Sequence, residues 1–465
     1  MSNNTNQFAS SLGEVFMRIA GKIGSQRHLV AVRDSFIAMM PITLAGAIAV
    51  LLNVFLRDIP NSLGWTGFAE AATPLISING HVYFGTIAIM ALFFAFSLGY
   101  NMALSYKINP LPAGMVTFAA FVATIPQTLT ITTNVAGLET SALAILKEAG
   151  MSVLEGADGV SLASSTWGAV AVGYAGASGL FSALIIGMIA SLIYCYLVNK
   201  KIAITLPDTV PPAVNKAFAA IIPGAVAIYV ASIIAYLVLT LTGQPLNDLI
   251  SRYIQQPLLG MSQSLGSVIL MTFLIQLLWF FGLHGHNVLG PILDTVYLTA
   301  LNENAAVYEA TKDVAQLPHI WTRGSFDAFA QMGGSGVTIA LIIAIFLFSK
   351  RDEHRAVAKL SAPMGIFNIN EPITFGIPMV LNPYFAIPWL IVPPVTATIA
   401  YLATSAGLIP PVFAPIPWIT PPGLYAFLAT GGNVMAGLVS LFNVFVAFLI
   451  WAPFVIMANK VKVDE

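Results

Sequence analysis

The chain has 465 residues, of which 57% are hydrophobic and only 8% are charged, and its mean hydropathy is +0.84. Soluble domains carry about 25% charged residues, so this composition lies outside their range and indicates an integral membrane protein. The 19 lysines and arginines nearly balance the 20 aspartates and glutamates, for a formal net charge of -1, which leaves no basic surface for nucleic acid.

The amino-terminal segment is the first predicted element. Residues 1–28 are polar and lack the apolar core and small-residue cleavage site of a signal peptide, so none is expected. Apolar residues recur at helical spacing between Phe8 and Ile23. This spacing predicts an amphipathic helix that lies along the inner surface of the membrane.

Long apolar stretches follow along the chain. Because the bilayer core offers the backbone no water, a spanning helix needs about 20 mostly apolar residues. The clear candidates are 36–56, 82–105, 110–133, 167–198, 221–241, 268–283, 336–348, 384–408 and 434–457. Two shorter pieces, 288–300 and 364–380, are interrupted by Gly and Pro, which predicts re-entrant segments. We therefore predict an all-α integral membrane protein with about ten transmembrane helices, re-entrant hairpins and interfacial amphipathic helices.

The single cysteine, Cys195, lies within the fourth of these stretches. A lone cysteine in an apolar run excludes a disulfide framework, a zinc cluster and a paired redox site. Its expected role is that of a small apolar side chain that fills space.

The orientation follows from the positions of the basic residues, which collect on the cytoplasmic side of membrane proteins. The loop 134–164 carries four acidic residues and one lysine, as an outer loop would. Basic residues fall on the opposite side in the amino-terminal segment, at Lys107, at Lys200 and Lys201, in the segment 350–359, and at Lys460 and Lys462. Both termini are therefore expected in the cytoplasm.

The character of the chain changes near residue 250. The earlier spans are long and regular, whereas the later ones are interrupted by Gly-Gly, Asn-Pro and Pro-Pro clusters. Broken helices at membrane depth survive only where they are buried or line a cavity. We predict two domains, with 1–250 as scaffold and oligomer interface and 251–465 as substrate domain.

One carboxylate stands alone in the second half. Between Lys359 and Lys460, Glu371 is the only charged residue, and no histidine occurs there. An ionisable group in membrane-embedded sequence costs several kcal/mol and therefore tends to face a cavity and to have a function. The alternative is a loop residue that reaches water.

Two histidines, His284 and His286, end an aromatic-rich span that includes Trp279. A neutral imidazole both donates and accepts a hydrogen bond, which suits a substrate hydroxyl. The alternative is a packed interfacial histidine. No further His or Cys clusters nearby, so no metal is expected at this pair.

Two further segments are ambiguous. Gly334 belongs to a glycine-rich run, 331–336, whose bare backbone permits close approach of either a ligand or another helix. The run is not a phosphate-binding loop because the lysine is missing, and no cofactor is expected. Trp418 lies between prolines, where its face could stack on a sugar ring or belong to the aromatic belt of the membrane interface.

The run Asn370-Glu371-Pro372-Ile373-Thr374-Phe375-Gly376-Ile377-Pro378, continued by Asn382-Pro383, resembles a known signature. It is similar to that of the membrane-spanning enzyme IIC of the bacterial phosphoenolpyruvate-dependent sugar phosphotransferase system, in its lactose, cellobiose and diacetylchitobiose branch. The segments 279–285, 206–223 and 319–336 agree, and the resemblance covers nearly the whole chain. His286 departs from the small residue that the family pattern has there.

The resemblance implies a homodimer in the bacterial cytoplasmic membrane. Its amino-terminal halves form the interface, and its carboxy-terminal halves carry the sugar across the bilayer in an elevator-type movement. Glu371 and His284 would bind the hydroxyl that is phosphorylated, and the carboxylate would accept its proton. Asn370 would contribute hydrogen bonds, Trp418 a stacking face and Gly334 close backbone approach.

The resemblance also implies a soluble partner, since no phosphoacceptor residue or nucleotide loop is recognisable in this sequence. The partner would be phospho-enzyme IIB, charged by enzyme IIA, and segment 350–359 is its candidate contact. The function implied is transport and phosphorylation of a disaccharide such as cellobiose or diacetylchitobiose. The alternative is an ion-coupled or facilitative sugar carrier with Glu371 as its proton site.

Overall fold

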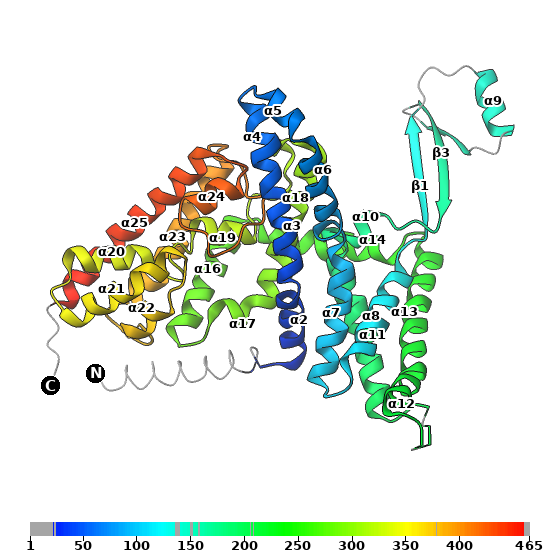
Figure 1. Cartoon of the computed structure of the whole chain (residues 1–465), viewed down its shortest axis with the longest axis horizontal. Helices are drawn as coiled ribbons and strands as arrows, with labels where there is room; N and C mark the ends of the chain where they lie inside the picture. The colour runs from blue at the N-terminus through cyan, green and yellow to red at the C-terminus, as the bar shows by residue number, and fades with distance from the viewer. Residues whose placement is uncertain are drawn as a thin grey trace.

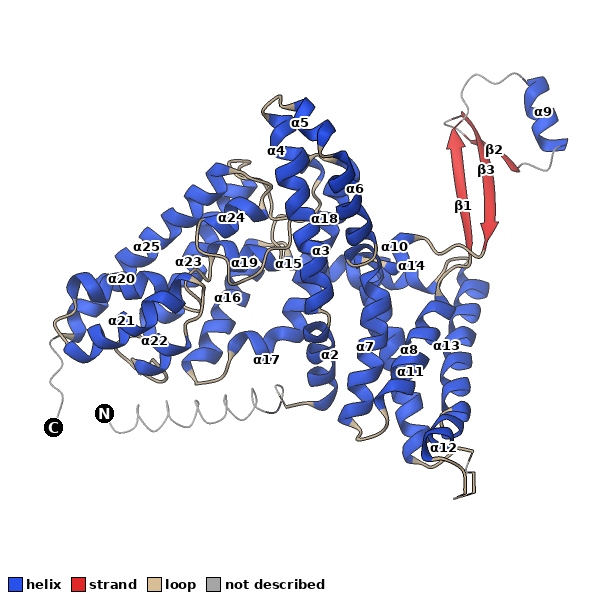
Figure 2. Ribbon diagram, viewed as in Figure 1, coloured by secondary structure: helices blue, strands red, loops and turns tan. Residues whose placement is uncertain are grey.

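The computed structural model describes residues 22, 25–134, 140–148, 152–156, 159–204, 206–207, 209–377 and 379–459. These residues are mostly helical, and the helices form an elongated molecule with one small sheet at its edge (Figure 1, Figure 2). The amphipathic helix predicted between Phe8 and Ile23 lies outside the described residues except for Lys22, and so do Lys460 and Lys462.

The first half of the chain is a bundle of long helices. In chain order its elements are α2 (Arg27–Ala38), α3 (Met40–Asn53), η1 (Val54–Asp58), α4 (Ile59–Ser62), α5 (Thr66–Ala71), α6 (Thr73–Phe84), η2 (Ile87–Ile89), α7 (Met90–Ser105), α8 (Pro110–Thr124), β1 (Thr128–Asn134), α9 (Thr140–Glu148), β2 (Ser152–Gly156), β3 (Gly159–Trp167), α10 (Val172–Ala175), η3 (Ala177–Gly179), α11 (Leu180–Asn199), α12 (Pro212–Ala219), α13 (Ile221–Thr242) and α14 (Leu246–Ile250). Helices α7 and α8 approach closely at Gly99, which has no side chain in the way. A Cβ at this position would lie 2.6 Å from the carbonyl oxygen of Ala113.

The second half alternates long helices with short ones and turns. Its elements are η4 (Ser251–Gln255), α15 (Gln256–Ser262), α16 (Leu265–Phe280), α17 (Gly285–Ile292), η5 (Leu293–Leu298), α18 (Thr299–Thr311), η6 (Val314–Gln316), α19 (Arg323–Phe329), α20 (Thr338–Phe348), α21 (Asp352–Ile366), α22 (Glu371–Gly376), α23 (Ala386–Ser405), α24 (Leu424–Ala429) and α25 (Val434–Ala458). Glycine, asparagine and proline interrupt the apolar sequence at the turns, which is why the helices are short there.

The apolar core has two parts. One cluster of buried side chains comes from α2, α7, α8, α11 and α13, and includes Phe94 and Phe121. The other comes almost entirely from the helices between α16 and α25, and includes Trp389 and Trp451. Each cluster supplies a hydrophobic core of its own.

Six helical stretches among the described residues are long and apolar enough to cross a membrane, and the bent pair α14–α15 with α16 raises the number to seven. They are Met40–Asn61, Thr73–Ser105, Ala177–Asn199, Val214–Thr242, Ala386–Ser405 and Val434–Ala458. Helices α8 and α20 are apolar but shorter. A mostly helical membrane protein is thus confirmed, whereas the count of ten crossings is not.

Two predicted spans have wrong boundaries. The stretch 110–133 leaves the helical conformation after Thr124, because Ile125 precedes Pro126 and a proline disfavours helix in the residue before it. The stretch 167–198 begins as the end of a strand, and its long helix starts only at Leu180. The predicted start ignored Gly168 and Gly176, which lie in non-helical turns before the long helix.

A three-stranded antiparallel sheet, ordered β1-β3-β2, corrects the all-α prediction. Strand β1 pairs with β3 from Thr128 opposite Trp167 to Asn134 opposite Ser161. The sheet and α9 project from the helical body at one end (Figure 2). The threonine-rich sequence of β1 favours a strand because β-branched side chains fit a pleated surface.

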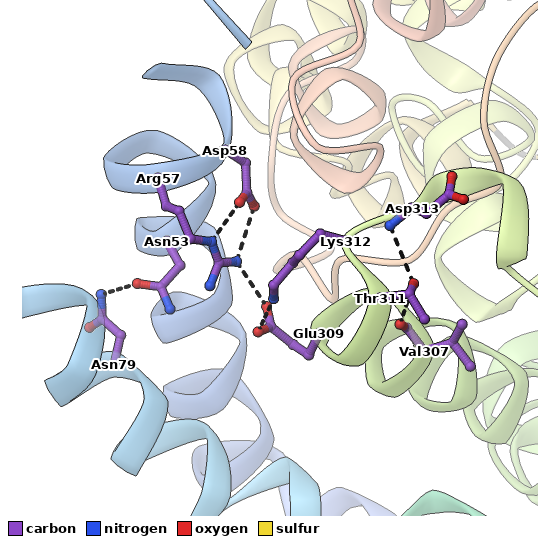
Figure 3. A network of polar contacts seen from close by, with 9 residues as sticks. All are labelled: Asn53, Arg57, Asp58, Asn79, Val307, Glu309, Thr311, Lys312 and Asp313. Carbon is purple, nitrogen blue, oxygen red and sulfur yellow. Dashed lines mark hydrogen bonds and ion pairs between the residues drawn. The ribbon is translucent and has the colours of Figure 1, made fainter. Parts of the chain in front are cut away.

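A polar network joins the first helices to the second half (Figure 3). Arg57 of η1 pairs with Asp58 at 2.7 Å and reaches Glu309 of α18 at 3.5 Å. Lys312 also pairs with Glu309. Since these side chains are only partly exposed, the network ties η1 to α18 in this arrangement of the molecule.

Candidate functional site

A cavity of about 450 Å³ lies between the first helices and the second half of the chain. One wall is apolar and comes from α2, α3 and the start of α7, with Phe36, Met39, Met40 and Met90 among its residues. The opposite wall is polar and comes from the turns around α17, α19 and α22. A volume of this size is typical of small-molecule sites.

His284 reaches the cavity from the turn that ends α16. Gly282 permits this turn with a φ of 79°, and Gly285 is required because a Cβ there would lie 2.2 Å from the carbonyl oxygen of Ile275. The ring of His284 caps α17, since its Nδ1 accepts a hydrogen bond from the backbone N–H of Asn287 at 3.3 Å. Its ring centroid lies 4.5 Å from that of Trp279. Among the residues that the structure describes, the Nε2 atom has no hydrogen-bond partner, so it can meet a ligand in the cavity.

Glu371 is the first residue of α22 and lines the cavity with a partly exposed side chain. A carboxylate is stabilised at this position because the amino-terminal end of a helix carries partial positive charge. The preceding Asn370 is buried, and its Nδ2 donates a hydrogen bond to Thr374 Oγ1 at 3.1 Å. This bond fixes the Asn370 side chain next to the carboxylate.

Gly334 brings the turn before α20 into contact with the turn before α22. A Cβ on Gly334, whose φ is 95°, would lie 2.6 Å from the Cβ of Asn370. The absence of a side chain at Gly334 therefore allows the Asn370 side chain to approach closely. Gly334 is also part of the cavity wall.

Asn368, which sequence reasoning missed as an individual site residue, connects three turns. Its Oδ1 accepts a hydrogen bond from the backbone N–H of Gly333 at 2.7 Å. Its Nδ2 donates to the carbonyl oxygens of Trp418 at 2.6 Å and Thr420 at 2.8 Å. Its left-handed backbone, with a φ of 64°, is one that asparagine tolerates better than most residues. The three turns that carry Gly334, Glu371 and Trp418 are thus held together by one side chain.

Trp418 is 46% exposed and lines the same cavity. It lies in a segment without regular secondary structure between α23 and α24. All five residues singled out from the sequence as substrate ligands therefore meet in one cavity. His286 also lines it, beside His284 at a centroid distance of 6.0 Å.

Three charged residues of the cavity wall were not predicted as site residues. They are Asp294 of η5 and the pair Arg323 and Asp327 of α19. The Arg323 Nη1 atom lies 3.0 Å from both carboxylate oxygens of Asp327, and its Nε lies 3.7 Å from Asp294 Oδ1. One sequence signal could have identified the pair of Arg323 and Asp327. They are four residues apart, and this spacing places both side chains on one face of a helix.

The cavity suits a neutral, hydroxyl-rich ligand. Carboxylates accept hydrogen bonds from hydroxyls, imidazole and amide groups both donate and accept them, and the indole face packs on apolar C–H surface. Among the described residues, no group of three His, Cys, Asp and Glu side chains is arranged to hold a metal ion. Three carboxylates and one guanidinium line the cavity.

Known proteins match nearly the whole chain. Residues 33–393 match the family described as "Phosphotransferase system, EIIC". The chain is 40% identical to the cellobiose-specific EIIC component of Lactococcus lactis subsp. lactis, over 96% of this chain and 97% of the relative. It is 32% identical to the oligo-beta-mannoside-specific EIIC component of Bacillus subtilis, over 98% and 95%.

A solved structure has the same fold. The crystal structure of the transporter ChbC, the IIC component of the N,N'-diacetylchitobiose-specific phosphotransferase system, superposes with a TM-score of 0.85. The two chains are 31% identical, and the match covers 97% of each. On the family match and these relatives together, the chain belongs to the EIIC family of the phosphotransferase system.

Proposed function

We propose that this protein is the sugar permease of a phosphotransferase system, and that it binds a β-linked disaccharide of the cellobiose or diacetylchitobiose type. The observation that carries the proposal is the convergence of Glu371, His284, Asn370, Gly334 and Trp418 on one cavity. The names of the relatives support the substrate class, because they include cellobiose-specific components and a diacetylchitobiose-specific transporter.

In this proposal Glu371 and His284 bind the hydroxyl that is phosphorylated. The carboxylate accepts the proton of that hydroxyl as the oxygen attacks phosphorus, and the His284 Nε2 atom orients the same oxygen. Asn370 adds hydrogen bonds, and Trp418 packs against the apolar face of a sugar ring. General base catalysis of this kind contributes about 10²–10⁴-fold to a rate.

The phosphoryl group comes from enzyme IIB, a separate partner that enzyme IIA charges. Phosphocysteine on IIB would have to reach the sugar from the cytoplasm. Helix α21 supports this assignment of the docking side, because Arg351, Arg355 and Lys359 in or next to it outnumber its acidic residues Asp352 and Glu353. A surface of this charge attracts an acidic partner.

Transport requires that the cavity open to each side in turn. We assign residues 1–250 to a scaffold that forms a homodimer and residues 251–465 to a domain that moves across the bilayer like an elevator. The two separate apolar clusters support this division, since each half retains its own core during such a movement. The movement would break the Arg57–Glu309 contact that joins η1 to α18.

The membrane arrangement completes the proposal. The turn between α7 and α8 and the connection from α11 to α12 lie on one side of the molecule, opposite the sheet (Figure 1). Basic residues Lys107, Lys200 and Lys201 belong to these connections, so this side is assigned to the cytoplasm. We assign both termini to the cytoplasm as well. In this proposal the shorter helices α8 and α20 and the broken segments bring the number of crossings to about ten.

The test is uptake of labelled cellobiose and diacetylchitobiose into membrane vesicles, with and without energised IIA and IIB, followed by analysis of the internal sugar. Phosphorylated sugar that appears only with the energised partners supports the proposal and ranks the two substrates. Free sugar that accumulates without them contradicts it, and would favour an ion-coupled or facilitative carrier with Glu371 as its proton site.

A further inference from the structure

Four charged side chains meet where η1 contacts α18, and none of the four lines the cavity (Figure 3). Arg57 and Asp58 belong to η1, whereas Glu309 and Lys312 lie at the end of α18. Arg57 Nε lies 2.7 Å from Asp58 Oδ1, and Lys312 pairs with Glu309. The two pairs are joined by Arg57 Nη2, which lies 3.5 Å from Glu309 Oε1. We refer to these four residues as the charge bridge.

The end of α18 is attached to the second half of the chain. The Nδ2 atom of Asn304 donates a hydrogen bond to the carbonyl oxygen of Val412 at 3.1 Å. One turn further along α18, the ring of Tyr308 stacks on that of Phe413, with a centroid distance of 3.9 Å. Tyr308 and Phe413 both belong to the buried core of the second half. The α18 side of the charge bridge therefore moves with that core.

The residues of η1 are attached to the first half. Asn79 of α6 donates a hydrogen bond at 2.9 Å to the Oδ1 atom of Asn53, which directly precedes η1. Both asparagines are buried. Helix α6 leads through η2 into α7, which supplies part of the core of the first half. The charge bridge is therefore a contact between the two halves.

Each side of the charge bridge keeps a counter-ion of its own. When an isolated, partly buried ion pair separates, each charge is left without a partner, which is costly. Here Arg57 would stay paired with Asp58. Glu309 would stay paired with Lys312. The four side chains are also between 13% and 36% exposed, so water and the counter-ions weaken the attraction across the contact. The halves can therefore separate at this point without leaving a charge unpaired.

We propose that the charge bridge is a releasable latch, which favours this arrangement of the two halves and sets how often the second half leaves it. The proposal rests on the movement proposed above. Lys312 competes with Arg57 for Glu309, because both cations approach the same carboxylate. Loss of Arg57 therefore loosens the latch, whereas loss of Lys312 tightens it, although each change removes one positive charge.

The test measures the distance between the halves in the full-length protein in liposomes. One spin label is placed on each half, at the exposed positions Ile202 and Leu408, in a Cys195→Ala background. Labelled protein is diluted with unlabelled protein. Pulsed electron–electron double resonance then gives the ratio of this arrangement to all others, and thermal unfolding shows whether each variant is folded.

Arg57→Gln is expected to lower this ratio by about two- to fivefold, the range for a partly exposed ion pair. Lys312→Gln should raise the ratio by about the same factor. In the Arg57→Gln background, Lys312→Gln should have no further effect, because the contact that it strengthens is absent. Lys201→Gln is the matched control, since Lys201 shares the φ of 57° of Lys312 but lies outside the charge bridge. It should leave the ratio unchanged.

A shift in the same direction for Arg57→Gln and Lys312→Gln, or no shift in either, would overturn the latch. If Arg57→Gln does not fold, Glu309→Gln removes the same contact from the other side and carries the same prediction. Failure of the proposed function looks different, because the wild-type protein would then form no phosphorylated sugar with energised IIA and IIB. The latch alone fails if the wild-type protein forms that product while the variants leave the ratio unchanged.

Discussion

The contact between Gly334 and Asn370 offers a direct test of how the site is built. In Gly334→Ala, the new Cβ would lie 2.6 Å from the Cβ and 2.7 Å from the Oδ1 of Asn370. Non-bonded carbon atoms settle at about 3.5–4.0 Å, so the two turns would have to separate by about 1 Å. Since Asn370 precedes Glu371, this separation displaces the carboxylate relative to the opposite wall.

The expected effect is large because binding groups act only in the right geometry. A displacement of about 1 Å can cost about 100-fold in a reaction that depends on orientation. The φ of 95° adds backbone strain of about 1–2 kcal/mol for any residue with a Cβ. We therefore expect phosphorylation of cellobiose to fall by about 100-fold in vesicles supplied with energised IIA and IIB.

Gly407→Ala separates the two effects. Gly407 has a φ of 72° in the same half, but a Cβ there would meet nothing within 4 Å. The Gly407→Ala variant therefore has the backbone strain of a positive φ but no collision of its Cβ with another residue. The rate at which this variant supports phosphorylation should stay within about twofold of the wild-type rate. Wild-type activity in folded Gly334→Ala would refute the reasoning, and an equal loss in Gly407→Ala would assign the effect to strain alone.

Four further variants test individual parts of the site. Glu371→Gln should lower phosphorylation of bound sugar by about 10²–10⁴-fold, because the proton acceptor is lost, while weak sugar binding persists. His284→Ala should weaken sugar affinity, measured by calorimetry on the purified protein, because the imidazole that hydrogen-bonds the sugar hydroxyl is removed. Asn368→Ala removes the side chain that bonds to three turns, and both the thermal unfolding midpoint and sugar affinity should fall. Cys195→Ala should phosphorylate sugar at the wild-type rate, because the thiol is buried in the first half, outside the cavity.

Each of these expectations has a result that contradicts it. An active Glu371→Gln variant would remove the carboxylate from the chemistry, and unchanged affinity in His284→Ala would make the histidine a packing residue. Asn368→Asp keeps the acceptor for Gly333 but turns a carboxylate oxygen towards the carbonyl oxygens of Trp418 and Thr420, so it should destabilise the protein at least as much as Asn368→Ala. A wild-type unfolding midpoint and affinity in either variant would contradict the role of Asn368. Lost phosphorylation in a folded Cys195→Ala variant would place the phosphoryl carrier on this chain.

The sequence identified the site where a charge was isolated in an apolar setting. Glu371 stands alone over about a hundred residues, and His284 ends an aromatic span, so both were recognisable without a structure. Asp294 and Arg323 were not, because they are far apart in sequence and only the turns around α17 and α19 bring them together. Asn368 was overlooked for a related reason, since its partners lie up to 52 residues away.

The fold was predictable where apolar stretches were long and uninterrupted. The helix α25 ends within one residue of its predicted end, and α13 is equally close. Errors arose where composition stayed apolar while local geometry changed, as at Pro126, after which a threonine-rich strand replaces the helix. Average hydropathy does not separate an apolar strand from an apolar helix, whereas proline and β-branched residues do.

The charges that line the cavity have a consequence for the step after phosphorylation. Even after Glu371 has taken the proton of the sugar hydroxyl, Asp294 and Asp327 outnumber Arg323, so with neutral histidines the wall stays negative. A phosphoryl group adds about 1.5–2 negative charges to the sugar at neutral pH. At a separation of about 8 Å and an effective dielectric constant of about 20, each pair of like charges would repel by about 2 kcal/mol. The cavity would therefore bind the neutral sugar but repel the sugar phosphate. Phosphoryl transfer itself would then make sugar transport one-way.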